Sequence, residues 1–169
     1  DVFTADVVRG LISGGRLVLC SWDTLLSPPN LYALMRAESV DLAEFVPALL
    51  RTLLQYVEET RQTFDFMRVL ISGSDALYAE EYKTLRALCS IDARVFNSYG
   101  LTETTIDNVI FESSAAEINP NGTTPLGRPF AGMRVYILDN QLQPVPAGVA
   151  GELYISGDCV ARGYLNRPD

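Results

Sequence analysis

The chain has 169 residues, of which 48% are hydrophobic and 20% are charged, and its formal net charge is −8. This composition is typical of one globular domain with its own core, and an acidic chain without a basic patch argues against nucleic acids or anionic membranes as partners. The sequence contains no histidine, so any chemistry would depend on carboxylates, hydroxyls, backbone amides and a bound cation.

The sequence shows no targeting segment and no cysteine pattern that indicates a function. No hydrophobic run approaches the roughly 18 residues that a membrane-spanning helix needs, and the first residues do not resemble a secretory signal. Cys20, Cys89 and Cys159 are far apart and odd in number, so they fit neither a zinc site nor a disulfide framework. We expect Cys20 and Cys159 in the hydrophobic core and the protein in a reducing cytoplasm.

The first part of the chain alternates helical and strand patterns. Hydrophobic residues at helical spacing predict helices over residues 7–12, 28–35, 47–57 and 78–88, the first ending at Gly14-Gly15. Short hydrophobic runs predict buried strands over residues 17–20, 42–46, 68–71 and 93–96. Repeated βα units of this kind favour an α/β fold with a parallel, flavodoxin-like sheet and helices on its faces.

The pattern changes beyond residue 107, where proline and glycine become frequent. Short β-rich runs lie between them at residues 108–111, 133–138 and 152–155. Such runs predict a small antiparallel β subdomain or distorted barrel. We therefore divide the chain into an α/β segment, residues 1–107, and a β-rich segment, residues 108–169, and expect a small-molecule site at the seam.

The most informative segment, residues 97–107, reads NSYGLTETTID and follows a predicted strand. Ligands of open α/β sheets bind beyond the carboxyl ends of strands, so the segment is typical of a nucleotide site. The Tyr99 ring can stack on a purine, the Thr102 hydroxyl can donate to a phosphate oxygen, and the Glu103 carboxylate can hold a hard divalent cation. The alternative for this string taken alone is an ordinary strand-to-loop turn.

This segment resembles the nucleotide motif of adenylate-forming enzymes. Residues 151–168 read GELYISGDCVARGYLNRP and resemble a second core motif of that superfamily, in the form found in adenylation domains of nonribosomal peptide synthetases. Residues 125–129 (PLGRP) and 136–139 (YILD) agree with that subgroup. The resemblance covers essentially the whole chain and implies the later half of the large N-terminal subdomain of such an enzyme.

The resemblance also implies a reaction. The intact domain would form aminoacyl-AMP from ATP and an amino acid, with Mg²⁺, and pass the amino acid to the phosphopantetheine thiol of a carrier protein. The phosphate loop, the ribose-binding aspartate and the catalytic lysine of such domains lie outside this chain, so we expect the segment alone to be inactive. Its expected partners are the amino acid, the remainder of its own adenylation domain, and the peptidyl carrier and condensation domains of the same synthetase.

The resemblance assigns nucleotide contacts residue by residue. Glu103 would hold Mg²⁺ and Thr102 would contact the α-phosphate. Tyr99 would pack on adenine, with Asn97 and the Ser98 backbone at its exocyclic amine. A turn of four residues would cover the other side of the base: Gly73, Ser74, Asp75 and Ala76. Gly100, the glycine after Tyr99, completes the set of nucleotide contacts. The family more often has a second glycine and a glutamate in that turn, so positions 74 and 75 depart modestly.

The amino-acid pocket is also implied by the resemblance. An aspartate at the position of Asp1 pairs with the α-ammonium of the substrate in this family. The remaining pocket positions in this chain are Val2, Ala5, Glu44, Ile71, Gly73, Ser98, Ile106 and Asp107.

Two of these positions are acidic, and Glu44 stands in an otherwise hydrophobic strand. A buried carboxylate needs a cation or a proton, and Asp107 would face the same cavity, which the small Ala5 makes long. Because a guanidinium can bridge two carboxylates, we expect arginine as the substrate, with lysine or ornithine next. Two alternatives stay open: tyrosine, whose phenol can donate to a carboxylate, and a Glu44 that points to solvent while Asp107 caps a turn.

Two other functions compete with this interpretation. An acyl- or aryl-CoA ligase of the same superfamily would not need Asp1, because its substrates lack an α-amine, and its second motif usually differs around Arg162. A non-catalytic nucleotide-binding module would keep the adenine site, but the intact Thr102 and Glu103 argue against it.

Overall fold

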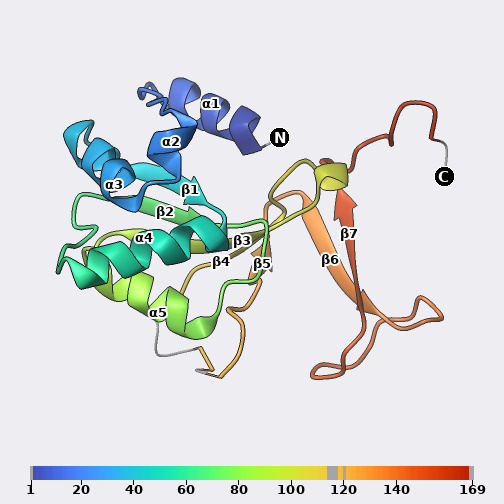
Figure 1. The fold of residues 1–169 in the computed structure, drawn as a ribbon. Helices are drawn as coiled ribbons and strands as arrows, with labels where there is room; N and C mark the ends of the chain where they lie inside the picture. Colours follow the sequence, from blue (N-terminus) through green and yellow to red (C-terminus); the bar gives the residue numbers. More distant parts are fainter. Residues whose placement is uncertain (1, 114–117, 120, 168–169) are drawn as a thin grey trace.

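The computed structural model describes residues 2–113, 118–119 and 121–167, which form a five-stranded sheet with helices packed against it and a two-stranded ribbon (Figure 1). The helices of the described chain are α1 (Val2–Ile12), α2 (Trp22–Leu25), α3 (Pro28–Ala37), α4 (Pro47–Glu59), α5 (Ala79–Leu88) and the 3₁₀ helix η1 (Thr102–Thr104). The strands are β1 (Leu42–Phe45), β2 (Val69–Ser72), β3 (Arg94–Tyr99), β4 (Val109–Phe111), β5 (Arg128–Pro129), β6 (Met133–Leu138) and β7 (Glu152–Gly157).

The large sheet has the strand order β1-β2-β3-β4-β5. The first three strands are parallel and are connected through α4 and α5, whereas β4 and β5 pair antiparallel. The register aligns Glu44 with Ile71 and Ile71 with Phe96. The carboxyl ends of β1, β2 and β3 therefore meet at one edge of the sheet, and the predicted α/β class with a parallel sheet and flanking helices is confirmed.

The hydrophobic core lies between this sheet and the helices that cover it. Helix α4 begins at Pro47, whose fixed φ suits a first helical position. Its hydrophobic stripe, Leu50, Leu53, Leu54 and Val57, is buried and has the helical spacing that the sequence predicted. Burying each such side chain contributes about 1.5–3 kcal/mol, so α4 holds β1 and β2 firmly in position.

The segment before α2 differs from the prediction. Residues 17–20 form no strand, and the side chains of Leu19 and Cys20 are exposed. The predictions of a buried strand and of a core position for Cys20 were therefore wrong. Strand β1 is therefore left at the edge of the sheet, and hydrophobic character alone was not enough to predict that residues 17–20 pair with it. The short helix α2, which the hydrophobic pattern did not predict, begins where the Ser21 hydroxyl accepts a hydrogen bond from the Thr24 amide.

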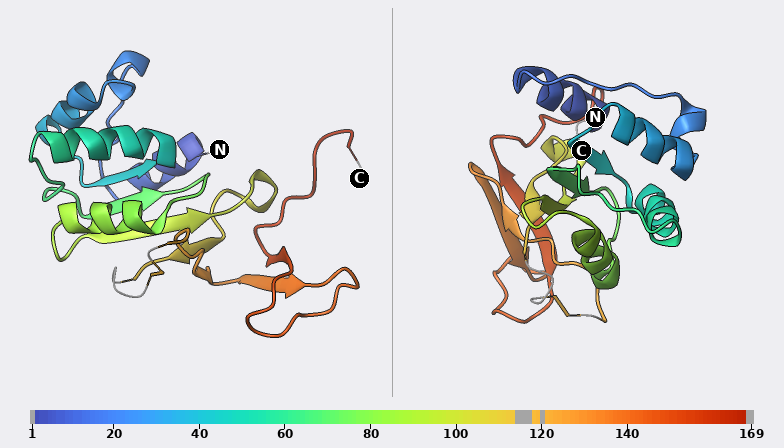
Figure 2. Two further views of the ribbon diagram at one scale, coloured as in Figure 1. Left: turned by 60° about the horizontal axis from the view of Figure 1, so that its bottom comes forward. Right: turned by 90° about the vertical axis from the view of Figure 1, so that its left-hand side faces the viewer.

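The sheet continues across residue 107, the expected boundary between the two segments. Strand β4 pairs with β3, and β5 pairs with β4. The visible break in the structure lies after β5: the antiparallel β6–β7 ribbon stands apart from the large sheet in Figures 1 and 2.

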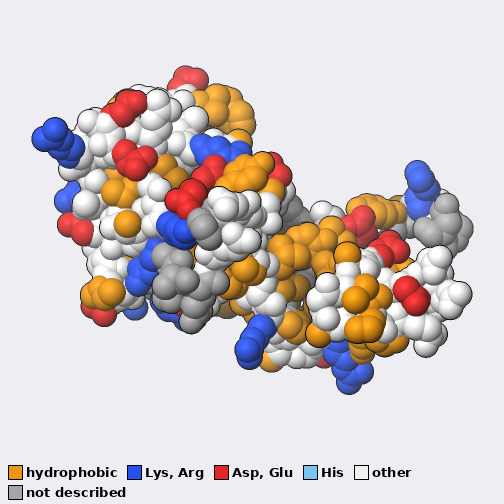
Figure 3. All heavy atoms as spheres, turned by 90° about the horizontal axis from the view of Figure 1, so that it is seen from below, with side chains coloured by type: hydrophobic (Ala, Val, Ile, Leu, Met, Phe, Trp, Pro, Cys, Tyr) orange, Lys and Arg blue, Asp and Glu red, His pale blue; other side chains and the backbone are white. Residues whose placement is uncertain are grey.

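Hydrophobic side chains are exposed over this ribbon. Figure 3 shows hydrophobic side chains gathered at that end of the molecule, and the exposed hydrophobic residues of β6 include Tyr136 and Ile137. A separate observation concerns membranes: within the described residues, no helix combines the length and the hydrophobicity that crossing a bilayer requires.

Candidate functional site

The carboxyl ends of β1, β2 and β3 bring three of the predicted pocket residues together. Gly73, directly after β2, is buried. A Cβ atom at this position would overlap the Ser98 hydroxyl on β3 and would lie 3.3 Å from Oε1 of Glu44 on β1. Only glycine therefore leaves room for these two side chains to approach each other.

An acidic cluster around one arginine lies beside these strand ends. Arg9 of α1 donates from one guanidinium nitrogen to Oε2 of Glu44 and from the other to Oδ2 of Asp107, at 3.0 Å in the second case. Asp6, one turn earlier on α1, lies 3.6 Å from the same guanidinium. The Glu44 side chain is only 4% exposed. Glu44 therefore does not point to solvent, although its strand is at the sheet edge.

Arg9 and Asp6 are the residues of this cluster that sequence reasoning missed. Part of the reason is that the first helix was predicted only over residues 7–12, whereas α1 begins at Val2 and places Asp6 and Arg9, three residues apart, on one face. A carboxylate in a hydrophobic strand also calls for a cationic partner. The partner is 35 residues from Glu44 and 98 residues from Asp107 along the chain, and the one sequence offers no sign of a pairing over such a separation.

Burial controls the protonation of these acids. The pKa of Glu44 is raised, first by loss of hydration and further by the charge of Asp107, while the hydrogen bond from Arg9 opposes the shift. The pKa of Asp6 is raised as well, mainly by burial, with Arg9 again opposing. The cluster contains three carboxylates and one guanidinium, so it favours further positive charge.

The nucleotide motif forms a tight loop directly after β3. A Cβ atom on Gly100 would overlap the backbone carbonyl of Ile106, so the chain turns back on itself at this glycine. Thr105 and Ile106 adopt φ angles of 61° and 71°, which are uncommon for β-branched residues and store strain. The loop leaves the side chains of Thr102 and Glu103 exposed on η1, where a ligand can reach both.

The second motif packs against this loop. The Tyr164 hydroxyl donates to Oε1 of Glu103 at 3.1 Å, and the Ala161 amide donates to the Glu103 carbonyl oxygen at 2.7 Å. The Thr105 hydroxyl donates to the carbonyl oxygen of Cys159 at 2.8 Å. Two segments that are about 60 residues apart therefore meet at the carboxylate that the sequence assigned to Mg²⁺.

The residues predicted to surround adenine lie at the end of β3 and in the turn that follows β2. Asn97 is buried and donates its side-chain amide to the Pro125 carbonyl oxygen at 3.0 Å, which leaves its own carbonyl oxygen as an acceptor. Tyr99 is half-buried at the end of β3. In the turn after Gly73, Ser74, Asp75 and Ala76 are exposed, and the Asp75 carboxylate accepts from the Ala76 amide at 2.7 Å.

The remaining predicted pocket residues lie on three elements. Val2 and Ala5 are half-buried on α1, Ile71 is buried in β2, and Ile106 is half-buried in the nucleotide loop. Asp1, the predicted partner of the substrate α-ammonium, lies outside the described residues.

A cavity of about 670 Å³ borders the acidic cluster. Its walls come from α1, the 13–20 segment, α3 and β1, and they include Asp6, Arg9 and Glu44. The nucleotide motif does not line this cavity. Because Arg9 contacts both Glu44 and Asp107, the cluster lies between the cavity and the nucleotide loop.

The site can be tested for its fit to Mg²⁺. The described residues contain no group of three or more acidic or cysteine side chains able to hold a metal ion. Mg²⁺ at nucleotide sites commonly binds one or two carboxylates together with phosphate oxygens and water. The single exposed carboxylate of Glu103, next to the Thr102 hydroxyl, fits that arrangement.

Comparison with known proteins identifies the family. Residues 2–165 match the AMP-binding enzyme family. Over all 169 residues the chain is 40% identical to gramicidin S synthase 2 of Brevibacillus brevis and 41% identical to tyrocidine synthase 3 of Brevibacillus parabrevis. It spans only 4% and 3% of the lengths of these relatives.

Solved structures agree with this result. A four-domain nonribosomal peptide synthetase bound to AMP and glycine is 29% identical, with a TM-score of 0.79 over 92% of this chain and 11% of the other. Another nonribosomal peptide synthetase, bound to α-methyl-L-serine-AMP, is 29% identical with a TM-score of 0.75 over 85% of this chain and 16% of the other. The chain belongs to the AMP-binding enzyme family, and its relatives and structural neighbours there are nonribosomal peptide synthetases.

Proposed function

We propose that this chain is the part of an adenylation domain that binds the amino acid and the adenine, and that the full-length protein activates a cationic amino acid. The reaction would join the substrate carboxylate to the α-phosphate of ATP, giving aminoacyl-AMP and pyrophosphate. The amino acid would then pass to the phosphopantetheine thiol of a carrier domain. The relatives support the reaction class, and the acidic cluster supports the substrate class.

The observation that carries the substrate proposal is the shared contact of Glu44 and Asp107 with one guanidinium. The two carboxylates come from separate segments, Glu44 from the carboxyl-terminal half of β1 and Asp107 from the loop after η1, and they meet near the strand ends where α/β folds bind ligands. Together with Asp6 they exceed the charge of Arg9. A positively charged side chain is therefore attracted there, and arginine, lysine and ornithine are the candidates. A neutral substrate such as tyrosine would leave this excess of negative charge uncompensated.

The nucleotide loop has the groups that the reaction needs. Carboxylate attack on a phosphate requires alignment and neutralisation of charge more than a covalent nucleophile. Thr102 would donate to the α-phosphate and Tyr99 would pack on adenine. Mg²⁺, held by Glu103, would neutralise phosphate charge when bound. The exposure of Thr102 and Glu103 on η1 is consistent with these roles.

The proposal includes the context of the chain. The remainder of the adenylation domain would supply the phosphate loop, the ribose-binding aspartate and the catalytic lysine, and the carrier and condensation domains would be partners in the same synthetase. Because the reaction consumes ATP, we place it in the cytoplasm.

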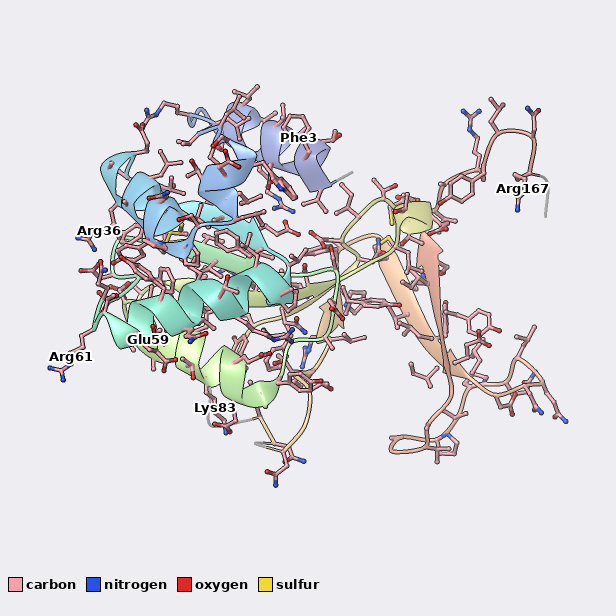
Figure 4. All side chains as sticks on the ribbon, in the orientation of Figure 1. Phe3, Arg36, Glu59, Arg61, Lys83 and Arg167 are labelled. Atoms are coloured by element: carbon pink, nitrogen blue, oxygen red, sulfur yellow. The ribbon has the colours of Figure 1, made fainter. Side chains whose placement is uncertain are left out.

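Amino-acid-dependent exchange of pyrophosphate into ATP by the full-length protein tests the proposal. Arginine, lysine and ornithine should stimulate exchange well above tyrosine, glycine and leucine. The Glu44→Ala variant should lose most of this stimulation, because it removes a buried charge partner. Glu59→Ala is the matched control, since Glu59 lies at the end of α4 in Figure 4 and its exposed carboxylate accepts a hydrogen bond from the Gln55 side chain.

Two results would contradict the proposal. Exchange that depends on a neutral amino acid would refute the cationic substrate. Exchange that no amino acid stimulates, with an aryl or acyl acid active instead, would refute the amino-acid-activating function.

A further inference from the structure

The side-chain geometry of Arg9 is that of a guanidinium already bound to two carboxylates. Its two terminal nitrogens contact Oε2 of Glu44 and Oδ2 of Asp107, one carboxylate each. A planar guanidinium is suited to such bridging because its donors have a fixed fork geometry. Arg9 therefore already makes the two guanidinium–carboxylate contacts that an arginine substrate was expected to make with Glu44 and Asp107.

Two polar atoms near Arg9 are not bonded to it: Oε1 of Glu44 and the hydroxyl oxygen of Ser98, both of which lie near Gly73. The Arg9 contact takes Oε2, while Oε1 faces Gly73 and lies 3.3 Å from where a Cβ atom of that residue would be. The Ser98 hydroxyl lies closer still to the same Cβ position, so it and Oε1 of Glu44 point toward one small region beside Gly73. This hydroxyl is buried and has no hydrogen-bond partner among the described residues, so a polar group of a ligand bound beside Glu44 would satisfy it.

The net charge of the cluster also favours an ammonium group. Arg9 compensates one of the three carboxylates contributed by Asp6, Glu44 and Asp107. A compact ammonium adds one positive charge and three donors that can point to single oxygen atoms. A second guanidinium would need a pair of carboxylate oxygens in one plane, and Arg9 already occupies the bridge between Glu44 and Asp107.

We propose that Arg9 is a specificity-determining residue that fills the guanidinium position, so that the site selects an amino acid ending in a primary ammonium, lysine or ornithine, over arginine. The substrate ammonium is held by Oε1 of Glu44 and the Ser98 hydroxyl. This inference rests on the proposed function and reverses the order that the sequence suggested, in which arginine came first.

The test compares kcat/KM for lysine, ornithine and arginine in pyrophosphate exchange by the full-length protein. The wild type should prefer lysine or ornithine over arginine. Arg9→Gln opens the bridging position, so the ratio of arginine to lysine activity should rise roughly tenfold or more, the equivalent of one hydrogen bond to a charged group. The KM for ATP should stay unchanged, because the ion pairs of Arg9 are with Asp6, Glu44 and Asp107, none of which belongs to the predicted adenine site.

Two further variants separate specificity from folding. Arg36→Gln breaks the exposed ion pair that Arg36, at the end of α3 (Figure 4), makes with Asp65, and it should leave the ratio unchanged. Ser98→Ala keeps Arg9 in place and removes the orphan hydroxyl. It should raise the KM for lysine or ornithine severalfold, and it carries the test if Arg9→Gln does not fold.

The outcomes are distinct. A wild type that uses arginine at least as well as lysine and ornithine overturns the inference, as does an Arg9→Gln protein with normal ATP binding and an unchanged ratio, or a Ser98→Ala protein with an unchanged KM. In these cases a cationic substrate still holds. A wild type that activates no cationic amino acid overturns the proposed function itself.

Discussion

At the scale of single residues, the buried carboxylate of Glu44 has the largest consequences. A lone charge in such surroundings would cost several kcal/mol, and the structure offsets this cost with Arg9. The offset is partial, because burial and the charge of Asp107 still raise the pKa of Glu44. Substrate binding through this group should therefore depend on pH.

We expect the KM for the cationic substrate to rise as the pH falls. Protonation removes the charge that attracts the substrate, and a raised pKa moves this loss to a higher pH than for an ordinary glutamate. Asp6, with its pKa also raised, contributes in the same direction. The KM for lysine, ornithine and arginine should be measured from about pH 8 to about pH 5, with the KM for ATP as reference.

The Glu44→Gln variant is the control for this pH dependence. It should show a high KM with little change across the range, because the titrating group is gone. A wild type whose KM for the cationic substrate stays flat over the range would show that Glu44 does not bind the substrate as a carboxylate.

The acidic cluster also shows what the sequence could predict at this scale. The position of Glu44 in a hydrophobic strand was enough to predict a need for a cation. The convergence of Glu44 and Asp107 followed from the family resemblance. The identity of the cation could not be predicted, because Arg9 reaches Glu44 and Asp107 from α1 over separations of 35 and 98 residues, and neither periodicity nor composition specifies such a contact.

At the scale of elements, Arg51 connects α4 to the turn that follows β2. It pairs with Glu81 of α5 and donates to the Ala76 carbonyl oxygen at 3.0 Å. Glu81 in turn accepts from the Tyr78 amide at 2.8 Å, and the Arg51 guanidinium lies over the Tyr78 ring. These contacts hold the turn of residues 73–76, which is expected to cover the adenine.

The Arg51→Ala variant should weaken ATP binding without affecting the amino acid. Losing the hydrogen bond to Ala76 and the partly exposed ion pair costs about 1 kcal/mol, so the KM for ATP should rise about fivefold. Lys83→Ala is the control, since Lys83 makes an exposed pair with Glu80 on the outer face of α5 (Figure 4). If the KM for the amino acid rises as much as the KM for ATP, Arg51 acts on the whole sheet edge instead of on the turn.

Elements with strong periodicity were predicted well, and those that depend on pairing were not. The buried stripe of α4 has four hydrophobic positions at helical spacing, Leu50, Leu53, Leu54 and Val57, and needed no other information. Residues 17–20 have an equally hydrophobic composition, yet they form no strand and leave β1 at the edge of the sheet. Strand β4 was predicted as a strand, but its pairing with β3 across residue 107 is a long-range choice.

At the scale of the whole molecule, the nucleotide motif and the second motif meet at Glu103, although Glu103 and Tyr164 are 61 residues apart along the chain. The ribbon of β6 and β7 is a two-stranded sheet, which is marginal by itself in water, and hydrophobic side chains cover it (Figure 3). The residues after β7 return to η1, where Tyr164 and Ala161 contact Glu103. The ribbon is thereby anchored to the nucleotide loop.

This anchoring predicts a role for Tyr164 in metal binding. A hydrogen bond to one oxygen orients the Glu103 carboxylate, and loss of such an outer partner commonly lowers metal affinity by 10-fold or more. In the full-length protein Tyr164→Phe should therefore raise the Mg²⁺ concentration needed for half-maximal pyrophosphate exchange by roughly tenfold. The maximal rate at saturating Mg²⁺ should change little, because Glu103 itself remains.

Tyr136→Phe is the matched control, because Tyr136 is an exposed tyrosine on β6 and its hydroxyl makes no contact with the nucleotide loop. Equal Mg²⁺ dependence in the wild type and Tyr164→Phe would show that the orientation of Glu103 is set by η1 alone. An increase in the KM of the amino acid, with Mg²⁺ dependence unchanged, would instead indicate that the contact transmits ribbon position to the acidic cluster. Only a change confined to Mg²⁺ supports the anchoring of Glu103 by the second motif.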